Sequence, residues 1–299
     1  MRRSDVLSAL AVRSDAFVVE IGAGPTPFMH TKLILDKYPF ENSERHGDIA
    51  NVAPVIKADA VKIPLADKSC DLLFVSHVLE HIDRPELFLA EAKRCAKWMY
   101  LEFPTRVREL MYAWSFHRWL IEIEDSKLIF YRNDIPQLHG EFFHEHYDFL
   151  LDVWSDERFA ELNHHLHIEA DRLAYEFSPQ SALEHVLHVS AKGEQKVNYR
   201  SRYGASGTGA VAYSPGLLLK TLLWALLPDA LLRMRRRMQD RVNEGRKQEL
   251  TDKIVSKLRC QKCSTSPLAF AEGSSRTVIL CRSCRTEYRQ VHGIFDFDV

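Results

Sequence analysis

VVEIGAGPTPF, at residues 18–28, is an apolar run that ends in a Gly-x-Gly turn. A short β-branched run of this kind predicts a buried strand. The two glycines allow the backbone to turn tightly and to approach a ligand closely. A dinucleotide-binding turn would need a third glycine where the chain has Pro27, and no Gly-Lys-Ser/Thr follows as in a Walker phosphate loop. The turn therefore disfavours NAD binding and excludes a Walker-type nucleotide site.

Short apolar runs recur along the chain to about residue 105, separated by segments typical of helices or loops. Before the last of these runs, Pro85 opens a segment whose apolar spacing predicts a helix with proline in its first turn. This alternation predicts an α/β fold built on a parallel sheet. The expected strands lie at residues 17–21, 32–35, 55–58, 71–75 and 98–103.

Further landmarks follow the glycine turn in a fixed order. Glu20 stands two positions before Gly22, Asp36 closes the second strand, and ADA at 58–60, IPL at 63–65 and CDLLFVSHVLEH at 70–81 come next. This series resembles the motifs of class I S-adenosylmethionine-dependent methyltransferases, over about residues 15 to 105. The resemblance implies a Rossmann-like sheet that binds S-adenosylmethionine, in an enzyme that transfers the cofactor's methyl group.

The resemblance also implies which residues bind the cofactor. The acidic residue and glycines of the first motif would shape the pocket of the methionine part. Asp36 would accept both ribose hydroxyls, because a carboxylate offers two acceptors to a vicinal diol, and Asp59 would accept from the adenine amino group. Asp36 follows Glu20 by only 16 residues, which predicts a short first helix and leaves Glu41 and Glu44 as alternatives. The implied cofactor-binding residues are Glu20, Gly22, Ala23, Gly24, Asp36, Asp59, Ala60, Ser76 and His77.

Methyl transfer from a sulfonium depends mainly on aligning the acceptor with the methyl group and sulfur, so a general base is optional. His77, at the exit of the fourth expected strand, is the candidate catalytic base, and a helix cap or pocket wall is its alternative role. A second group of histidines includes His144 and His146, which with Glu141 could bind a metal that ionises a hydroxyl. The alternative is an aromatic, histidine-lined substrate pocket without metal.

Four of the six cysteines form two Cys-x-x-Cys pairs with seventeen residues between them. This spacing is typical of a structural zinc ribbon, in which four thiolates close the coordination shell and leave no position for a substrate water. A module of about forty residues needs such a metal because its own core is small. We expect one structural Zn²⁺, with the ligands Cys260, Cys263, Cys281 and Cys284.

The flanks of these cysteines, including Tyr288 and VHGIFDF at 291–297, resemble the small zinc-ribbon proteins that activate tRNA and translation-factor methyltransferases. The resemblance implies a module that binds and stabilises a methyltransferase, here within the same chain. Gln261 and Phe295 replace prolines that are usual in that family. A generic ribbon for nucleic-acid or protein binding is the alternative.

The chain divides into three expected regions. Residues 1–213 would form the S-adenosylmethionine-binding domain, with an aromatic and histidine-rich insertion at about 106–150 as a lid or substrate-binding segment. Residues 214–257 would be a helical connector, apolar and then basic, and residues 258–299 the zinc ribbon.

Local patterns within these regions predict further elements. Alternating apolar residues at 166–177 and 184–189 indicate strands, and the polar segment 192–209 indicates a loop. In the connector, helices are expected at 217–227 and 229–258, on either side of Pro228.

Charge and hydropathy limit the partners. The net charge of −1 and a pI near 6.9 exclude a global basic excess, but residues 233–259 hold ten Lys/Arg and four Asp/Glu, a local charge of +6. The start of the chain lacks the apolar core of a secretory signal, and the longest apolar stretch, 217–232, is interrupted by charges and Pro228. We expect a cytoplasmic protein that does not span a membrane.

Residues 216–247 could contact an anionic membrane peripherally, because an apolar helix containing Trp224 precedes the arginine cluster. Packing against the catalytic domain is the alternative. The acceptor of the methyl group is expected to be a small molecule, a saccharide or a lipid-linked compound. A methyltransferase acting on RNA or a translation protein is the second hypothesis, and a non-catalytic cofactor-binding scaffold is the third.

Overall fold

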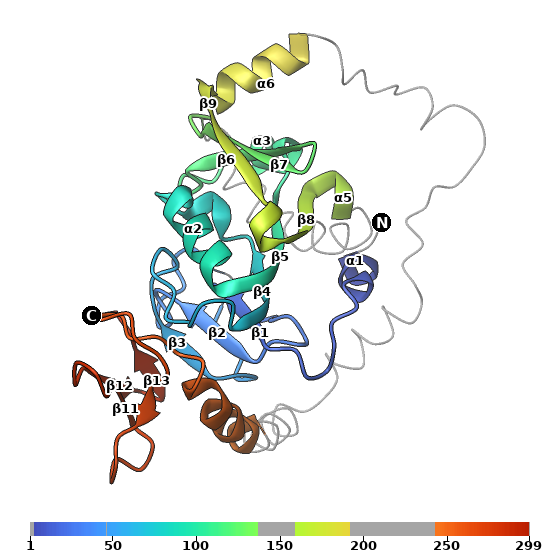
Figure 1. Ribbon diagram of the computed structural model, residues 1–299. Helices are drawn as coiled ribbons and strands as arrows, with labels where there is room; N and C mark the ends of the chain where they lie inside the picture. The colour runs from blue at the N-terminus through green and yellow to red at the C-terminus, as the bar shows by residue number, and fades with distance from the viewer. Residues whose placement is uncertain (1–2, 46, 137–158, 192–242, 299) are drawn as a thin grey trace, which may run out of the picture.

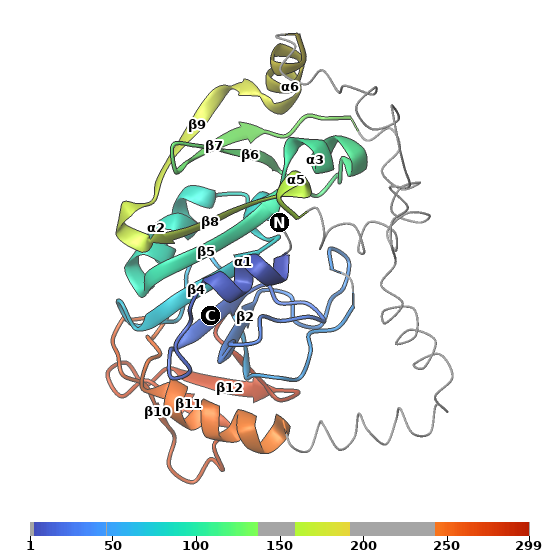
Figure 2. The same ribbon diagram turned by 90° about the vertical axis from the view of Figure 1, so that its right-hand side faces the viewer.

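The computed structural model describes residues 3–45, 47–136, 159–191 and 243–298. Its main sheet contains the strand order β3-β2-β1-β4-β5, with all five strands parallel, and β8 pairs antiparallel with β5 at one edge (Figures 1 and 2). The strands are β1 (Val18–Ile21), β2 (Leu33–Asp36), β3 (Val55–Lys57), β4 (Cys70–Ser76), β5 (Ala96–Pro104) and β8 (Asn163–Glu169). The expected α/β fold with a parallel sheet is therefore confirmed.

The strand order reverses direction at β1, since β2 lies on one side of it and β4 on the other. In open parallel sheets this arrangement leaves a crevice outside the carboxyl ends of the two central strands, and ligands bind there. The turns that follow β1 and β4 begin at Gly22 and His77. The topology thus brings the Gly-x-Gly turn and the candidate catalytic histidine to the same edge of the sheet.

Helix α2 (Pro85–Cys95) connects β4 to β5 and confirms the expected crossover. Pro85 occupies the start of the helix, where no N–H is needed for an intrahelical bond. Phe88, Leu89 and Ala92 are fully buried in the core shared with the sheet. Lys93 and Arg94 stand in the last turn, where positive charge favours the helix.

A second sheet, in the order β6-β7-β9, lies beyond β5 and β8 (Figure 1); α3 and α6 contact this sheet, and α5 contacts β8. Strands β6 and β7 form an antiparallel hairpin, and β9 adds to β7 in parallel. The elements are α3 (Arg106–Tyr112), β6 (Trp119–Glu124), β7 (Lys127–Arg132), α5 (Phe159–Leu162), the 3-10 turn η2 (Ala170–Arg172), β9 (Ala174–Ser181) and α6 (Ala182–Ala191).

The C-terminal cysteine module joins the main sheet directly. Its strands β10 (Ala269–Phe270), β11 (Val278–Leu280) and β12 (Glu287–Val291) are antiparallel, and β13 (Ile294–Asp296) then pairs in parallel with β3. Ile279 and Tyr288 are fully buried, and the Tyr288 ring stacks on Phe297 with the centroids 3.9 Å apart. The module is thus a continuation of the main sheet.

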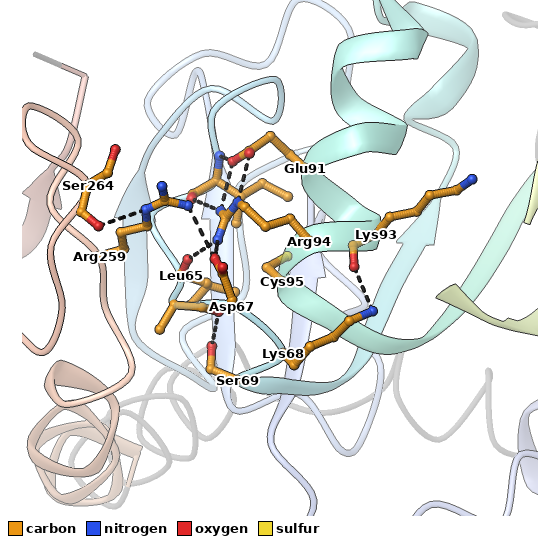
Figure 3. A network of polar contacts seen from close by, with 12 residues as sticks. Leu65, Asp67, Lys68, Ser69, Glu91, Lys93, Arg94, Cys95, Arg259 and Ser264 are labelled. Carbon is orange, nitrogen blue, oxygen red and sulfur yellow. Dashed lines mark hydrogen bonds and ion pairs between the residues drawn. The ribbon is translucent and has the colours of Figure 1, made fainter. Parts of the chain in front are cut away.

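A polar network connects the start of the module to the domain that contains the main sheet (Figure 3). Arg94 of α2 donates to Asp67 at 2.8 Å, and Arg259 reaches the same Asp67 oxygen at 3.3 Å. Arg259 also donates to the Ser264 carbonyl at 3.0 Å, and its own N–H bonds to Pro64 O at 3.1 Å. Two cations from distant parts of the chain therefore share one carboxylate at the junction.

The structure corrects two local expectations and shows the fold of part of a third segment, the 106–150 insertion. Residues 22–32 form turns, with no helix between β1 and β2, because Pro25 and Pro27 interrupt the segment. Residues 184–189 lie in helix α6 and do not form a strand. The described part of the 106–150 insertion contains α3 and the β6-β7 hairpin of the second sheet, so this part is a folded extension of the domain.

The structure describes only the end of the connector, from residue 243 onward. Residues 243–255 are helical, which confirms that part of the helix expected at 229–258. The loop expected at 192–209, the helix at 217–227 and the boundary near residue 213 lie outside the described residues. Among the helices that the structure describes, none is both long enough and apolar enough to cross a membrane. The first short helix of the chain is α1 (Arg3–Ala9).

Candidate active site

Gly22 makes the turn that follows β1. Its φ of +65° lies in the left-handed region, which glycine adopts without strain. A Cβ built on Gly22 would lie 2.5 Å from a methyl carbon of Val78, in the turn after β4. The two turns thus approach each other too closely for any side chain at position 22, and both conformation and space require glycine there.

Glu20 fixes the loop that follows this turn. One of its oxygens accepts from the Phe28 N–H at 2.9 Å and from the Thr31 hydroxyl. Burial raises the pKa of Glu20, and these two hydrogen bonds partly offset that effect. The carboxylate is 5% exposed and holds residues 28–31 against the end of the sheet. Glu20 thus stabilises the loop after the turn through these two hydrogen bonds.

Asp36 ends β2 and is buried beside an arginine. Its Oδ2 pairs with Arg45 at 2.7 Å, and its Oδ1 accepts from the Tyr38 N–H at 2.8 Å. Burial raises the pKa of Asp36, while Arg45 opposes that rise. Arg45 also donates to the carbonyls of Tyr38 and Glu41. It thereby holds the loop after β2 in place.

Asp59 follows β3 with its side chain 28% exposed. Its Oδ1 accepts from the Val61 N–H at 3.0 Å, and its Oδ2 pairs with Lys37 Nζ at 2.7 Å. The ends of β2 and β3 thus each present one carboxylate, as expected from the sequence, and each carboxylate is oriented by a cation from the loop after β2.

His77 forms the corner at which the chain leaves β4, with a φ of +54°. Its N–H donates to the Glu102 carbonyl at 2.8 Å, and its Nδ1 lies 3.3 Å from Glu80 Oε1. Its Nε2 lies 3.1 Å from Arg108 Nη1 and 3.5 Å from Glu102 Oε1. Burial and Arg108 lower the pKa of His77, but the hydrogen bonds to Glu102 and Glu80 outweigh them and leave it raised.

A cavity of about 610 Å³ opens among these groups. It is lined by residues that end β1, β2 and β3, by the turns after β4, and by the loop at 37–45. Five of the nine predicted cofactor-binding residues line it: Gly22, Asp36, Asp59, Ala60 and His77. The alternatives Glu41 and Glu44 line it as well.

The other four predicted residues are absent from the cavity wall. Glu20 lies on β1, Gly24 lies in the loop that follows it, and Ala23 is buried against Ile34 and Ala53. Ser76 points to Glu102, to which it donates at 2.9 Å, and it accepts from Arg3. The hydroxyl of Ser76 is thus used within the sheet, and the expected place of Ser76 on the reactive side stays a prediction.

Residues 31–98 match a family described as a methyltransferase domain. The match runs from the residue two positions before β2 into β5 and so includes Asp36, Asp59 and His77. This segment of the chain is therefore similar to a methyltransferase domain. None of the curated proteins matches the chain.

Several solved structures resemble the methyltransferase domain. An S-adenosylmethionine-dependent methyltransferase from Aquifex aeolicus is 20% identical, with a TM-score of 0.28, over 34% of this chain and 64% of that protein. The chain thus spans less than two thirds of the Aquifex protein. A possible histamine N-methyltransferase from Thermotoga maritima is 25% identical over 34% and 50% of the two chains, with a TM-score of 0.27.

A third similar structure is a complex that joins the Trm112 methyltransferase activator of Haloferax volcanii to a protein described as a methyltransferase. It is 16% identical, with a TM-score of 0.30, over 44% of this chain and 72% of the matched chain.

Several residues of the methyltransferase domain were missed by sequence reasoning. Arg45, Lys37 and Arg108 each contact a predicted site residue, but they stand in irregular loops or in α3, outside any motif. Glu102 is 2% exposed and lies next to His77 because β5 pairs with β4. A charged residue within the apolar run of an expected central strand was the one signal that could have identified it.

Three histidines of the second group, His164, His165 and His167, lie on one strand. His164 lies on β8 and pairs with Glu122 of β6 at 2.9 Å. His165 and His167 lie on the same strand, where His167 packs against Trp98. The metal hypothesis based on Glu141, His144 and His146 lies outside the described residues.

The four cysteines of the C-terminal module come together as expected. Their sulfur atoms lie within 4.8 Å of one another, with Cys260 and Cys284 at 3.6 Å and Cys263 and Cys281 at 3.5 Å. All four are free thiols. Sulfurs bound at about 2.3 Å to one tetrahedral Zn²⁺ lie about 3.8 Å apart, so the arrangement fits that ion.

Proposed function

We propose that the chain transfers a methyl group from S-adenosylmethionine to a small-molecule, saccharide or lipid-linked acceptor. The observation that carries this proposal is that Gly22, Asp36, Asp59 and His77 line one cavity at the carboxyl ends of β1 to β4. S-adenosylmethionine would supply both the methyl group and the leaving group. The chain's own residues bind the cofactor, orient the acceptor and exclude water.

The cofactor roles follow from what each side chain can offer. The glycine turn lets the backbone approach the methionine part, and Asp36 would accept from the ribose with lone pairs that Arg45 and Tyr38 leave free. Glu41 and Glu44, on the opposite loop, are the alternative ribose acceptors. Asp59 would accept from the adenine amino group, oriented by its bonds to Lys37 and Val61.

A small acceptor is supported by the extent of the cavity. From the cofactor residues it continues past His77 to His81, Ile82 and Arg118. Its volume lies within the range of roughly 300–1,000 Å³ that is typical of small-molecule sites. Among the described residues of the 106–150 insertion, Arg118 lines this cavity.

Two further parts of the proposal concern the cysteine module and the connector that precedes it. The cysteine module would hold one structural Zn²⁺ and, through β13, stabilise the methyltransferase domain within the same chain, as the activator resemblance implies. Residues 216–247 would bring the enzyme to an anionic membrane surface from the cytoplasm. Flotation with liposomes that contain anionic lipid tests this contact, and packing against the domain would leave the protein unbound.

RNA or a translation protein is the second candidate acceptor. It is favoured by the local charge of +6 at residues 233–259, because lysine and arginine neutralise phosphates. Binding to RNA that falls steeply with added salt would support this acceptor over a small molecule.

The deciding experiment has two stages. Calorimetry with S-adenosylhomocysteine compares the wild type with Asp59→Asn, and Asp67→Asn serves as a matched control outside the cavity. Labelled S-adenosylmethionine is then incubated with small-molecule, lipid, RNA and protein fractions. Transfer to the first two fractions is expected. Transfer to RNA or protein would replace the acceptor, and binding without any transfer would indicate a scaffold.

A further inference from the structure

Three potential metal ligands, Glu80, His81 and His117, meet beside the cavity, and His81 lines it. The 3-10 turn η1 (Leu79–His81) places Glu80 and His81 directly after the β4 turn. His117 approaches them from the loop that leads into β6. One ligand atom from each residue lies within 4.8 Å of those of the other two, and the rings of His81 and His117 have centroids 4.7 Å apart.

The carboxylate of this group is buried and incompletely satisfied. Glu80 is 1% exposed, and its Oε2 has no hydrogen-bond partner among the described residues, while Oε1 faces His77. The Nδ1 atom of His81 is also buried without a hydrogen-bond partner, and Glu44 Oε2 lies 3.3 Å from it outside hydrogen-bond geometry. Buried polar atoms are normally paired, so two unpaired atoms in one cluster point to a missing partner.

His117 is held as metal-bound histidines usually are. Its Nδ1 contacts an oxygen of Glu109, which is 1% exposed and can only accept in its ionised form. This contact assigns the proton to Nδ1 and leaves Nε2 with a free lone pair. A histidine ligand typically donates its second ring N–H to a carboxylate in this way.

The charge balance also calls for a cation. Glu80 and Glu109 are both buried, and among the described residues the ion pairs of these two carboxylates are with histidines. A buried charge needs a compensating partner.

We propose that Glu80, His81 and His117 bind one divalent transition-metal ion, of the kind that Zn²⁺ or Co²⁺ represents, in the wall of the cavity. Two imidazoles and one carboxylate suit such ions. Ligands at about 2.1 Å from a tetrahedral ion lie about 3.4 Å apart, so the site closes by small side-chain rotations. His81 lines the cavity, which gives the ion an access path and turns its open coordination positions toward a bound acceptor.

Binding of this ion can be measured without methyl transfer and separately from the cysteine module. The full chain, with its cysteine site loaded with zinc, is equilibrated with Co²⁺ and freed of unbound ion. Elemental analysis is expected to find one Co²⁺ per chain, with weak visible absorption and no thiolate-to-cobalt charge-transfer band. A thiolate band would place the ion in the cysteine module.

The variants Glu80→Gln and His117→Asn should each lose this ion, and His167→Asn, which changes a histidine outside the cluster, should retain it. Glu109→Gln should weaken Co²⁺ binding roughly 10- to 100-fold through the orientation of His117. Glu80→Gln keeps the shape of the side chain, and its binding of S-adenosylhomocysteine reports that the cavity is intact. Absence of Co²⁺ from the wild type, or its retention in both ligand variants, would overturn the site.

Discussion

Phe295 pairs in parallel register with Ile56, so the last strand of the chain extends the sheet that holds the cofactor cavity. Without β13, β3 would be an exposed edge with unpaired backbone groups. Asp59 follows β3 directly, and Lys57 of β3 pairs with Asp296 at 3.1 Å. The C-terminal module is therefore coupled to the wall of the cavity through one strand.

This coupling predicts that loss of the cysteine site destabilises the whole protein. Cys281→Ser should remove one equivalent of zinc and lower the melting temperature of the full chain, because zinc binding and folding of so small a module are linked. Elemental analysis and calorimetry measure the two effects. Ser283→Ala, in the same Cys-x-x-Cys pair, is the control and should change neither. A Cys281→Ser protein with unchanged melting temperature would show that β13 contributes nothing to the domain.

The two glycines of the first motif should respond differently to alanine. Gly22→Ala places a Cβ at 2.5 Å from Val78 and imposes strain at a φ of +65°, which we expect to cost about 1–3 kcal/mol of stability and to weaken cofactor binding strongly. At Gly24 the added Cβ would meet only Arg45, at 3.8 Å, an ordinary contact. Gly24→Ala should therefore stay within about 1 kcal/mol of the wild type by urea unfolding. Equal effects of the two changes would contradict the assigned turn geometry.

The sequence predicted the parallel sheet because its signals are local. Apolar runs mark the strands, Pro85 marks the start of α2, and the Gly-x-Gly turn marks the end of β1. The cofactor roles of Asp36, Asp59 and His77 were implied by the resemblance to class I methyltransferases. Their meeting at one edge follows from the sheet, since carboxyl ends of parallel strands lie on the same side.

What the sequence could not predict depends on contacts between distant segments. Arg45 reaches Asp36 from an irregular loop, and Glu109 meets His117 only after α3 has packed. Residues 184–189 alternate like a strand, yet they form part of α6, where Ala182 and Val186 pack against the second sheet. A short alternating pattern does not distinguish the two structures when tertiary packing supplies the decisive contacts.

Acid should unfold the domain in part through Glu102. Burial raises the pKa of Glu102, but His77 and Arg3 outweigh burial and lower it to about 2 from 4.5. Because the folded-state pKa is depressed, the stabilisation is present above pH 4.5 and is lost as the pH falls toward 2. It amounts to roughly 3 kcal/mol, at about 1.4 kcal/mol per pKa unit.

Denaturant unfolding between pH 7 and pH 2 measures this contribution. Glu102→Gln should be less stable than the wild type at pH 7, and the difference should shrink as the pH falls below 4.5. A Glu102→Gln deficit that persists to pH 2 would mean that packing, and not ionisation, accounts for the effect.

The final prediction separates a catalytic His77 from a pocket wall. The variant of choice is His77→Asn, because asparagine tolerates the left-handed conformation at a φ of +54°. If His77 removes a proton from the acceptor, turnover should fall about 10²- to 10⁴-fold while the affinity for S-adenosylhomocysteine stays within a few-fold.

The raised pKa of His77 means that the wild-type rate should decline on the acid side from a midpoint above 6.5, because the protonated ring cannot accept a proton. This acid limb should vanish in His77→Asn. The Arg108→Met variant removes the donor that occupies Nε2 and should move the midpoint further upward, since Arg108 opposes protonation of the ring. Parallel loss of turnover and cofactor affinity in His77→Asn would make His77 a wall of the pocket.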